Sequence, residues 1–280
     1  MDYLVFWAVL GAALLHAGWN AVLKSGDDPF VTVTHLSLFS GGIALFCLPF
    51  VSVPVSGAWI WLALSALIHT AYRLLLIQAY RTGDLVHVYP IARGAAPLIT
   101  AVATLLLIGE SIGTAGFLGV CALSLGVFLL SLRGGRLATF DSRTVGFALG
   151  SALATASYSL VDGIGARVNG SGPGFAMWMF VGNMLVMQAL ALAVKGPAIY
   201  RSLPATWPVV FAGGLMSMLA YFVVIWAMTR APIALVAALR ETSVLFAGLI
   251  SLLILKEPLT RWRAAAALII VSGVVLLRLA

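Results

Sequence analysis

The chain has 280 residues, of which 62% are hydrophobic and only 9% are charged. A water-soluble domain carries charge on roughly a quarter of its residues, so this composition, with a mean hydropathy of +1.10, excludes an ordinary soluble protein. The net charge of +7 does not indicate nucleic-acid binding, because the basic residues lie in short segments between apolar runs. Basic residues in such segments set the orientation of a membrane protein. We therefore predict that lipid surrounds most of the surface.

Ten apolar runs follow one another along the chain, separated by charged residues and by glycine and proline. A membrane-spanning helix needs about 20 apolar residues. We therefore predict an all-α integral membrane protein with ten transmembrane helices. The first run lacks a preceding basic segment and a clear cleavage site, so we expect it to be a retained helix. The predicted spans are approximately 3–23, 30–50, 58–80, 85–108, 113–132, 145–166, 174–194, 208–229, 232–255 and 262–279.

The longest polar stretch, Arg133 to Thr144, separates the first five spans from the last five. The ten residues that begin at Gly11 align without gaps with those that begin at Gly150. Matches in a common order are typical of an internal repeat, and we predict two five-helix repeats, over 1–133 and 144–280. The other matches are Ala71, Tyr72 and Arg81 with Ala220, Tyr221 and Arg230, and then Arg93, Glu110 and Gly126 with Arg240, Glu257 and Gly273.

The odd number of helices in each repeat sets their relative orientation. The second repeat must enter the membrane from the side opposite to the first, so the two repeats are expected to be inverted copies. Many secondary transporters are built in this way.

The distribution of lysine and arginine between the two sides predicts where the termini lie. The side that holds both termini has three of these residues, and the other side has ten. The cytoplasmic side carries the excess in bacterial inner-membrane proteins, so both termini are predicted to be extracytoplasmic. The three are Arg167, Arg230 and Arg278, and the ten are Lys24, Arg81, Arg133, Arg136, Arg143, Lys195, Arg201, Lys256, Arg261 and Arg263.

Two motifs occur once in each half. The first span contains Trp19-Asn20, echoed by Tyr158-Ser159, and the segment Leu106-Leu-Ile-Gly-Glu110 recurs as Leu253-Ile-Leu-Lys-Glu257-Pro258. With these motifs the whole chain resembles, as two tandem modules, the EamA-type transporters of the drug/metabolite transporter superfamily. The resemblance implies helices around a central cavity, alternating access, and export of amino acids, metabolites or drugs. The aromatic richness looks most like the YddG-type exporters of aromatic and other amino acids.

Polar and aromatic side chains recur on single faces of the predicted helices. His16, Trp19 and Asn20 are spaced i, i+3, i+4, which places them on one face. An unsatisfied polar group inside a membrane is costly, so such residues face a cavity or one another. Packing between helices is the alternative for the aromatic residues, and interhelical hydrogen bonding is the alternative for the histidines. The predicted substrate cavity comprises His16, Trp19, Asn20, His69, Tyr72, Tyr89, Arg93, Tyr158, Asp162, Tyr221 and Arg240.

Charges within the predicted spans do not balance. Three cations, Arg73, Arg93 and Arg240, accompany two anions, Asp162 and Glu241. Asp162 is expected either to neutralise one of the arginines or to carry a coupling proton. Arg93 is expected either to attract the carboxylate of a substrate or to form a structural pair with Asp162. Glu241 would point about 100° away from Arg240 on an ideal helix and is expected to pair elsewhere.

Enzyme chemistry finds little support in the sequence. The histidines at positions 16, 35, 69 and 87 lack the HExxH spacing of a metalloprotease, and no GxSxG motif is present. We therefore expect no catalytic residue, metal or cofactor. The alternatives are a membrane-embedded enzyme, an ion channel, or a transporter of the same fold for drugs, lipid-linked sugars or nucleotide sugars. The expected partners are a small-molecule substrate and the lipid bilayer but no nucleic acid, and the chain is expected to be monomeric.

Overall fold

The structure is a computed structural model that describes residues 1–82, 85–130, 142–253, 256 and 260–280. The side chains of residues 24, 25, 79–82, 85–91 and 251 also lie outside the description. Most of the stretch from Arg133 to Thr144, predicted to separate the repeats, therefore lies outside the described residues. The same holds for Glu257 and for the side chain of Tyr89.

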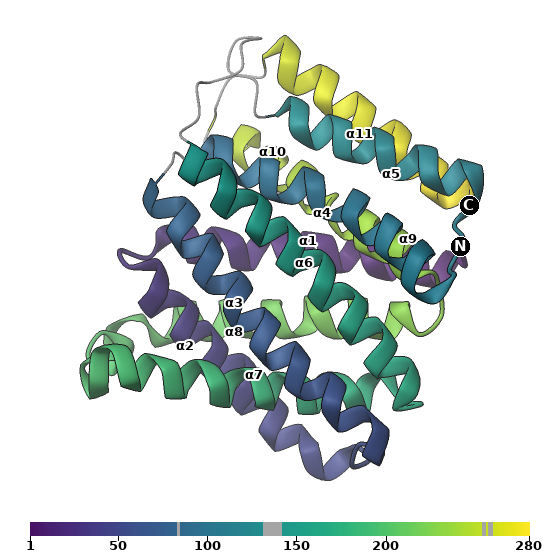
Figure 1. Cartoon of the computed structure of the whole chain (residues 1–280). Helices are drawn as coiled ribbons and strands as arrows, with labels where there is room; N and C mark the ends of the chain where they lie inside the picture. Colours follow the sequence, from purple (N-terminus) through teal and green to yellow (C-terminus); the bar gives the residue numbers. More distant parts are fainter. Residues whose placement is uncertain (83–84, 131–141, 254–255, 257–259) are drawn as a thin grey trace.

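The described part of the chain is helical and contains no strand (Figure 1). Its helices are α1 (Tyr3–Ser25), α2 (Pro29–Cys47), α3 (Trp59–Thr82), α4 (Leu85–Ile108), α5 (Gly113–Leu129), α6 (Ser142–Val168), α7 (Gly172–Lys195), α8 (Leu203–Met228), α9 (Ile233–Arg240), α10 (Ser243–Leu253) and α11 (Arg261–Leu279). Eight described segments are long and apolar enough to cross a membrane, and Ala92–Ile108 and Gly113–Leu129 are shorter apolar helices. The predicted fold class, an all-α membrane protein with ten spans, is confirmed.

The ninth predicted span is not one continuous helix. It breaks after Arg240 into α9 and α10, which together form one apolar segment, Ile233–Ile250. The amides of Glu241 and Thr242 donate to the carbonyls of Ala238 and Leu239, three residues back, at 3.0 and 3.1 Å. These hydrogen bonds between residues three apart give the backbone amides at the break an acceptor. A break in the helix is therefore tolerated at this depth in a membrane.

Helix α2 shows how side chains fix the helix ends. Oδ1 of Asp28 accepts a hydrogen bond from the amide of Phe30 at 2.9 Å, and Pro29 occupies the first turn, where no amide donor is needed. The other carboxylate oxygen of Asp28 pairs with Nζ of Lys195 at the end of α7. Burial raises the pKa of the Asp28 carboxyl, but these hydrogen bonds outweigh it and lower that pKa below its ordinary value.

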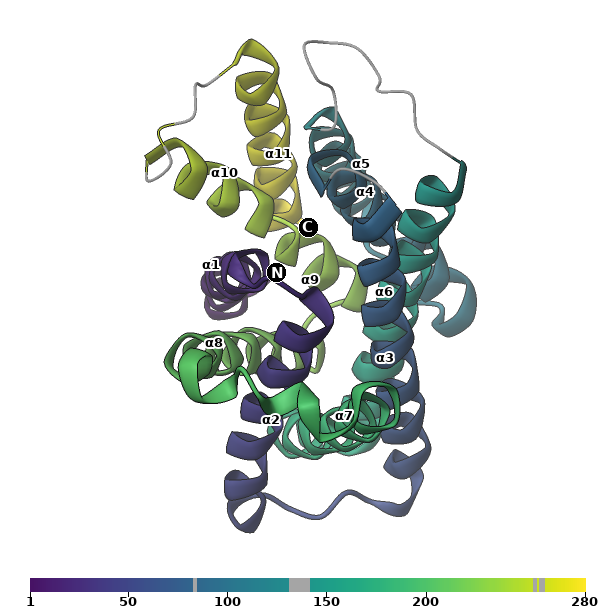
Figure 2. The ribbon, with the colours of Figure 1, turned by 90° about the vertical axis from the view of Figure 1, so that its left-hand side faces the viewer.

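Contacts between helices have a two-fold pattern. Helix α1 packs against α8 and α3 against α6, while α2 packs against α7 and α5 against α11. If each helix of the first half is exchanged for the corresponding helix of the second half, the same set of helix pairs is obtained. Inverted repeats would produce this pattern, although the division into two repeats stays a prediction. Figure 2 shows α1, α8 and α10 on one side and α3, α4 and α6 on the other, with α9 between them.

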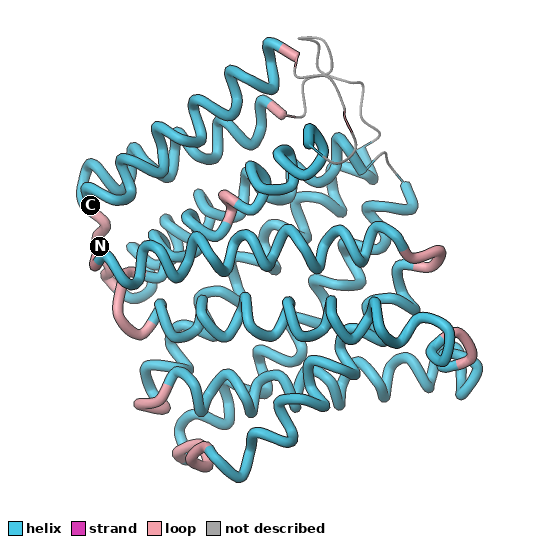
Figure 3. Tube along the Cα trace, turned by 180° about the vertical axis from the view of Figure 1, so that it is seen from behind, coloured by secondary structure: helices cyan, strands magenta, loops and turns pink. Residues whose placement is uncertain are grey.

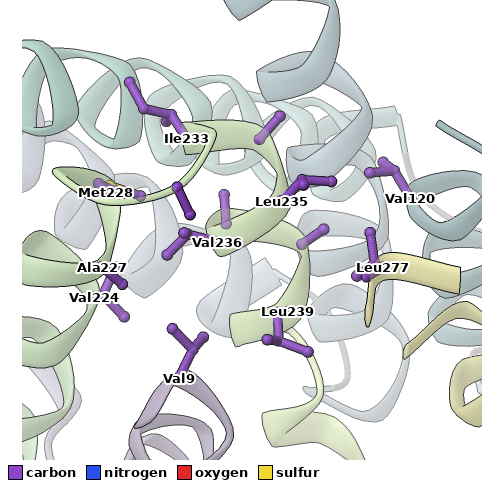
Figure 4. Packing of buried hydrophobic residues seen from close by; sticks show 14 of the residues in the cluster. Val9, Val120, Val224, Ala227, Met228, Ile233, Leu235, Val236, Leu239 and Leu277 are labelled. Carbon is purple, nitrogen blue, oxygen red and sulfur yellow. The ribbon is translucent and has the colours of Figure 1, made fainter. Parts of the chain in front are cut away.

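Helix α9 lies in the centre of an apolar core, and all of its residues are buried. Figure 4 shows Leu235 and Leu239 of this helix among Val9 of α1, Val120 of α5 and Leu277 of α11. Close packing on every side holds the helix in place. Arg240, the last residue of α9, is therefore carried into the interior.

Both termini lie at the same end of the molecule (Figure 3). Nη1 of Arg278 donates to the carbonyl of Met1 at 2.7 Å, and its guanidinium lies 3.9 Å from the centre of the Tyr3 ring. An even number of spans requires this arrangement. The side of the membrane on which the termini lie stays a prediction.

Glycines bring α5 and α11 into contact through their backbones. A Cβ added to Gly273 would lie 2.9 Å from the carbonyl oxygen of Gly119, and one added to Gly126 would lie 3.0 Å from that of Ala266. Small residues permit this close approach between helices in a membrane. The two helices come from different halves of the chain.

Candidate functional site

A cavity lies between α1, α2 and α3 of the first half and α6, α7, α8 and α9 of the second. The structure brings together, on the wall of this cavity, most of the side chains that the sequence suggested. The predicted residues that line it are His16, Trp19, His69, Tyr72, Tyr158, Tyr221 and Arg240. Asn20 does not line it: its Nδ2 donates to the carbonyl of His16 at 2.7 Å.

The cavity is polar at one end and apolar at the other. Along α3 its lining passes from His69 through Arg73 to Ile77, and along α1 it passes from His16 to Leu23. Helices α1 and α3 end, and α2 begins, near the apolar end. An amphiphilic solute would therefore place its polar group at mid-membrane and its apolar part toward these helix ends.

Aromatic rings and a buried carboxylate form one wall of the polar end. The His69 ring stacks on Tyr158 with centroids 4.1 Å apart, and Tyr221 meets His69 edge-on at 5.5 Å. Behind the rings, Oδ2 of Asp162 accepts from the Tyr221 hydroxyl at 2.6 Å and from Nε2 of His69 at 2.9 Å. Asp162 is fully buried and pairs with these rings instead of with an arginine, so its expected role as an arginine partner is wrong.

Arg93 does not behave as the sequence suggested. Its Nη1 lies 3.1 Å from each carboxylate oxygen of Glu241, and its Nη2 contacts Nε2 of His16. The expected pair with Asp162 is therefore wrong. Arg93 is buried and is not among the described residues that line the cavity, where a contact with a solute was expected. The physical reason is the break after α9, which brings Glu241 to the inner face of α4.

Arg240 carries positive charge directly to the cavity wall. Its side chain is 2% exposed, and its guanidinium lies 5.6 Å from the centre of the Tyr158 ring and 5.8 Å from that of Tyr221. Nη2 lies 3.4 Å from Oε1 of Glu241, whereas Nε and Nη1 have no hydrogen-bond partner among the described residues. Glu241 was expected to pair with a residue other than Arg240. This expectation is only half right, because Glu241 pairs with Arg93 but also contacts Arg240.

Arg73 is the second cation of the lining. Its Nη1 is buried and also has no partner in the described part of the chain. The sequence indicated only that Asp162 could neutralise Arg73, and it did not indicate that Arg73 lines the cavity. The charge surplus expected within the spans is therefore found at Arg73 and Arg240 instead of at Arg93.

Several lining residues carry no clear signal in the sequence. Ser37 and Ser40 of α2 and Ser217 of α8 line the cavity, but serine often bonds to its own helix and so marks no face. Asn183 of α7 also lines it. Oγ of Ser37 and Oδ1 of Asn183 are buried without a partner among the described residues.

Comparison with known proteins supports this architecture. A solved structure, titled only as the crystal structure of a protein, matches with a TM-score of 0.77 over 99% of this chain and 96% of its own, at 19% identity. At that identity the likeness shows the fold alone. No curated protein matches the chain.

The second half of the chain identifies the family. Residues 142–279 match the EamA-like transporter family. This segment comprises α6 to α11 and supplies Tyr158, Tyr221 and Arg240 to the cavity. The resemblance to the EamA-type transporters is thereby confirmed, and the second half of the chain belongs to the EamA-like transporter family, a family of membrane transporters of the drug/metabolite type.

Proposed function

We propose that the chain is a secondary transporter of the inner membrane that exports small carboxylate-bearing metabolites, with aromatic and neutral amino acids as the first class to test. The observation that carries this proposal is the pair of arginines on the cavity wall. Arg240 and Arg73 offer buried guanidinium donors that no described residue satisfies. A carboxylate matches the planar donor array of a guanidinium group.

The rest of the lining suits the body of such a solute. Trp19 and Phe180 offer aromatic faces, and Val33, Leu36 and Leu76 offer apolar contact. Small-molecule sites combine apolar walls with a few placed polar groups in this way. Export of organic cations, the multidrug alternative, is disfavoured because the guanidinium groups would repel them.

Alternating access needs the cavity to be closed at one end in each state. At the end that holds the termini, Oε1 of Glu110 accepts from Nη2 of Arg167 at 2.8 Å, and Oε2 accepts from the amide of Ile233 at 2.7 Å. Arg167 also donates from Nε to the carbonyl of Met228 at 2.9 Å. This cluster ties together the ends of α4, α6 and α8 and supports a state closed on the predicted extracytoplasmic side.

Counterflow in proteoliposomes tests the proposed function. Vesicles containing the purified chain are loaded with unlabelled phenylalanine, leucine or glutamate, and uptake of the labelled compound is followed with and without a pH gradient. Saturable exchange above that of protein-free vesicles is expected for the apolar amino acids. Exchange of organic cations, with none of any carboxylate-bearing solute, would contradict the proposal.

A further inference from the structure

The buried charges near the cavity leave an excess of one cation. Arg93 is matched by Glu241, and Asp162 is bonded to His69 and Tyr221. Arg73 and Arg240 both line the cavity, together with His69. Among these groups around the cavity, three arginines (Arg73, Arg93 and Arg240) are therefore accompanied by only two carboxylates (Asp162 and Glu241). An uncompensated cation at this depth in a membrane is expensive, so a bound solute gains by supplying one negative charge.

Among the described residues, the same wall offers no carboxylate that would neutralise an ammonium group. None of the described lining residues is an aspartate or a glutamate. Glu241 is occupied by Arg93 and Arg240, and Oδ2 of Asp162 is occupied by His69 and Tyr221. The ammonium group of an amino acid would therefore face two guanidinium groups at the polar end without a carboxylate partner, which weakens its binding.

We propose that the cavity selects solutes with a net charge of minus one: amphiphilic organic monoanions whose carboxylate contacts Arg240 and Arg73, and whose apolar body lies along Trp19 and Leu36. This inference rests on the proposed function, since it specifies the class of carboxylate that the same cavity binds. Removal of the α-ammonium group from an apolar amino acid then improves binding.

The polar residues of the lining fit this assignment. Nε and Nη1 of Arg240 and Nη1 of Arg73 are donors that still lack acceptors among the described residues. A carboxylate has two oxygens, so it can accept from one donor of each arginine. The guanidinium group of Arg240 lies 5.6 Å from the centre of the Tyr158 ring and 5.8 Å from that of Tyr221, so the aromatic rings flank the position proposed for the carboxylate.

A set of four compounds with one phenyl body separates the contributions of charge. At neutral pH, 3-phenylpropanoate is an anion, phenylalanine is a zwitterion, 3-phenylpropanamide is uncharged and phenethylamine is a cation. Binding is measured as ligand-dependent thermal stabilisation of the purified chain in detergent, because weak acids and amines cross bilayers unaided. We expect 3-phenylpropanoate to bind about tenfold or more tightly than phenylalanine, and phenethylamine to bind least.

Two substitutions test the residues responsible. Arg240→Gln and Arg73→Gln are each expected to lower the preference for 3-phenylpropanoate over its amide about tenfold or more. Arg230→Gln is the matched control, because Arg230 is exposed and stacks on Trp226 away from the cavity. Among the described residues, Glu241 pairs with Arg93 and Arg240 and not with Arg73, so the Arg73 variant serves if Arg240→Gln does not fold.

The outcomes separate the two proposals. Phenylalanine binding as tightly as 3-phenylpropanoate, or more tightly, overturns the selection of monoanions and leaves the proposed export of amino acids standing. An unchanged preference in both arginine variants overturns the assignment of these residues. Absence of binding by both carboxylates, together with absence of amino-acid counterflow, overturns the proposed function and this inference together.

Discussion

Nη1 of Arg93 lies 3.1 Å from both carboxylate oxygens of Glu241, and this buried contact joins α4 of the first half to the break that follows α9 in the second. Glu241 also contacts Arg240, so one carboxylate serves two guanidinium groups. The position of Arg240 on the cavity wall therefore depends on an ion pair outside the cavity.

Loss of the Glu241 charge should destabilise the protein. Glu241→Gln leaves two buried arginines without their carboxylate, and breaking a buried pair from one side costs about 3–5 kcal/mol. A lower midpoint of thermal unfolding in detergent is expected. The double variant Arg93→Gln with Glu241→Gln removes one charge of each sign and should recover part of this loss. Asp27→Asn, at an exposed position, is the control. A double variant no more stable than Glu241→Gln alone would contradict the pairing.

Aromatic residues on the cavity wall should contribute to solute binding. Trp19→Ala and Tyr158→Ala each remove a ring that lines the cavity, and loss of one aromatic contact costs about 0.5–1.5 kcal/mol beyond the buried area. The KM for counterflow should therefore rise several-fold while the protein still folds and inserts. Trp7→Ala provides the control, because Trp7 is 63% exposed. Unchanged transport in both cavity variants would favour a packing role for these rings.

Asp162 should position the rings of the polar end. Tyr221→Phe keeps the ring but removes the hydroxyl that donates to Asp162, and hydrogen bonds to charged groups are worth about 1.5–3 kcal/mol. A lower unfolding midpoint is expected, and Tyr3→Phe at the exposed N-terminal end serves as the control.

Asp162→Asn should reduce solute exchange and solute accumulation to the same extent, because both depend on the arrangement of His69 and Tyr221. Counterflow measures exchange, and uptake against a gradient measures accumulation. A variant that exchanges solute at the full rate but cannot concentrate it would assign Asp162 to proton coupling instead.

Both termini should lie outside the cytoplasm. After replacement of Cys47 and Cys121 by serine, a cysteine at Ala280 should react with a membrane-impermeant thiol reagent in intact spheroplasts. A cysteine at Asp27, at the opposite end, should react only after lysis. The reverse pattern would overturn the orientation that the basic residues predict.

The sequence predicted the spans well because each depends on local composition. An apolar run of about 20 residues has few alternatives in a membrane. It did not predict the break after Arg240, where no glycine or proline marks the position and Glu241 and Thr242 interrupt an otherwise apolar span. That break decides the partner of Arg93, so the error at this residue follows from it.

Side-chain partners in the cavity could be predicted only in part. The i, i+3, i+4 spacing found His16 and Trp19, because a helix face follows from spacing alone. The partners of Asp162 could not be found in this way, since Tyr221 and His69 come from helices whose relative position depends on tertiary packing. The position of Arg73 on the cavity wall likewise depends on how the helices pack, so the sequence alone could not predict it.

The glycine contacts between α5 and α11 constrain how this protein can move. A side chain at Gly119 or Gly273 would meet the neighbouring backbone within about 3.0 Å, so these helices have no compressible layer between them. Sliding one helix along the other would require the two backbones to separate. The pair formed by α5 and α11 is therefore a natural fixed frame, against which the displacement of every other helix during a transport cycle can be measured.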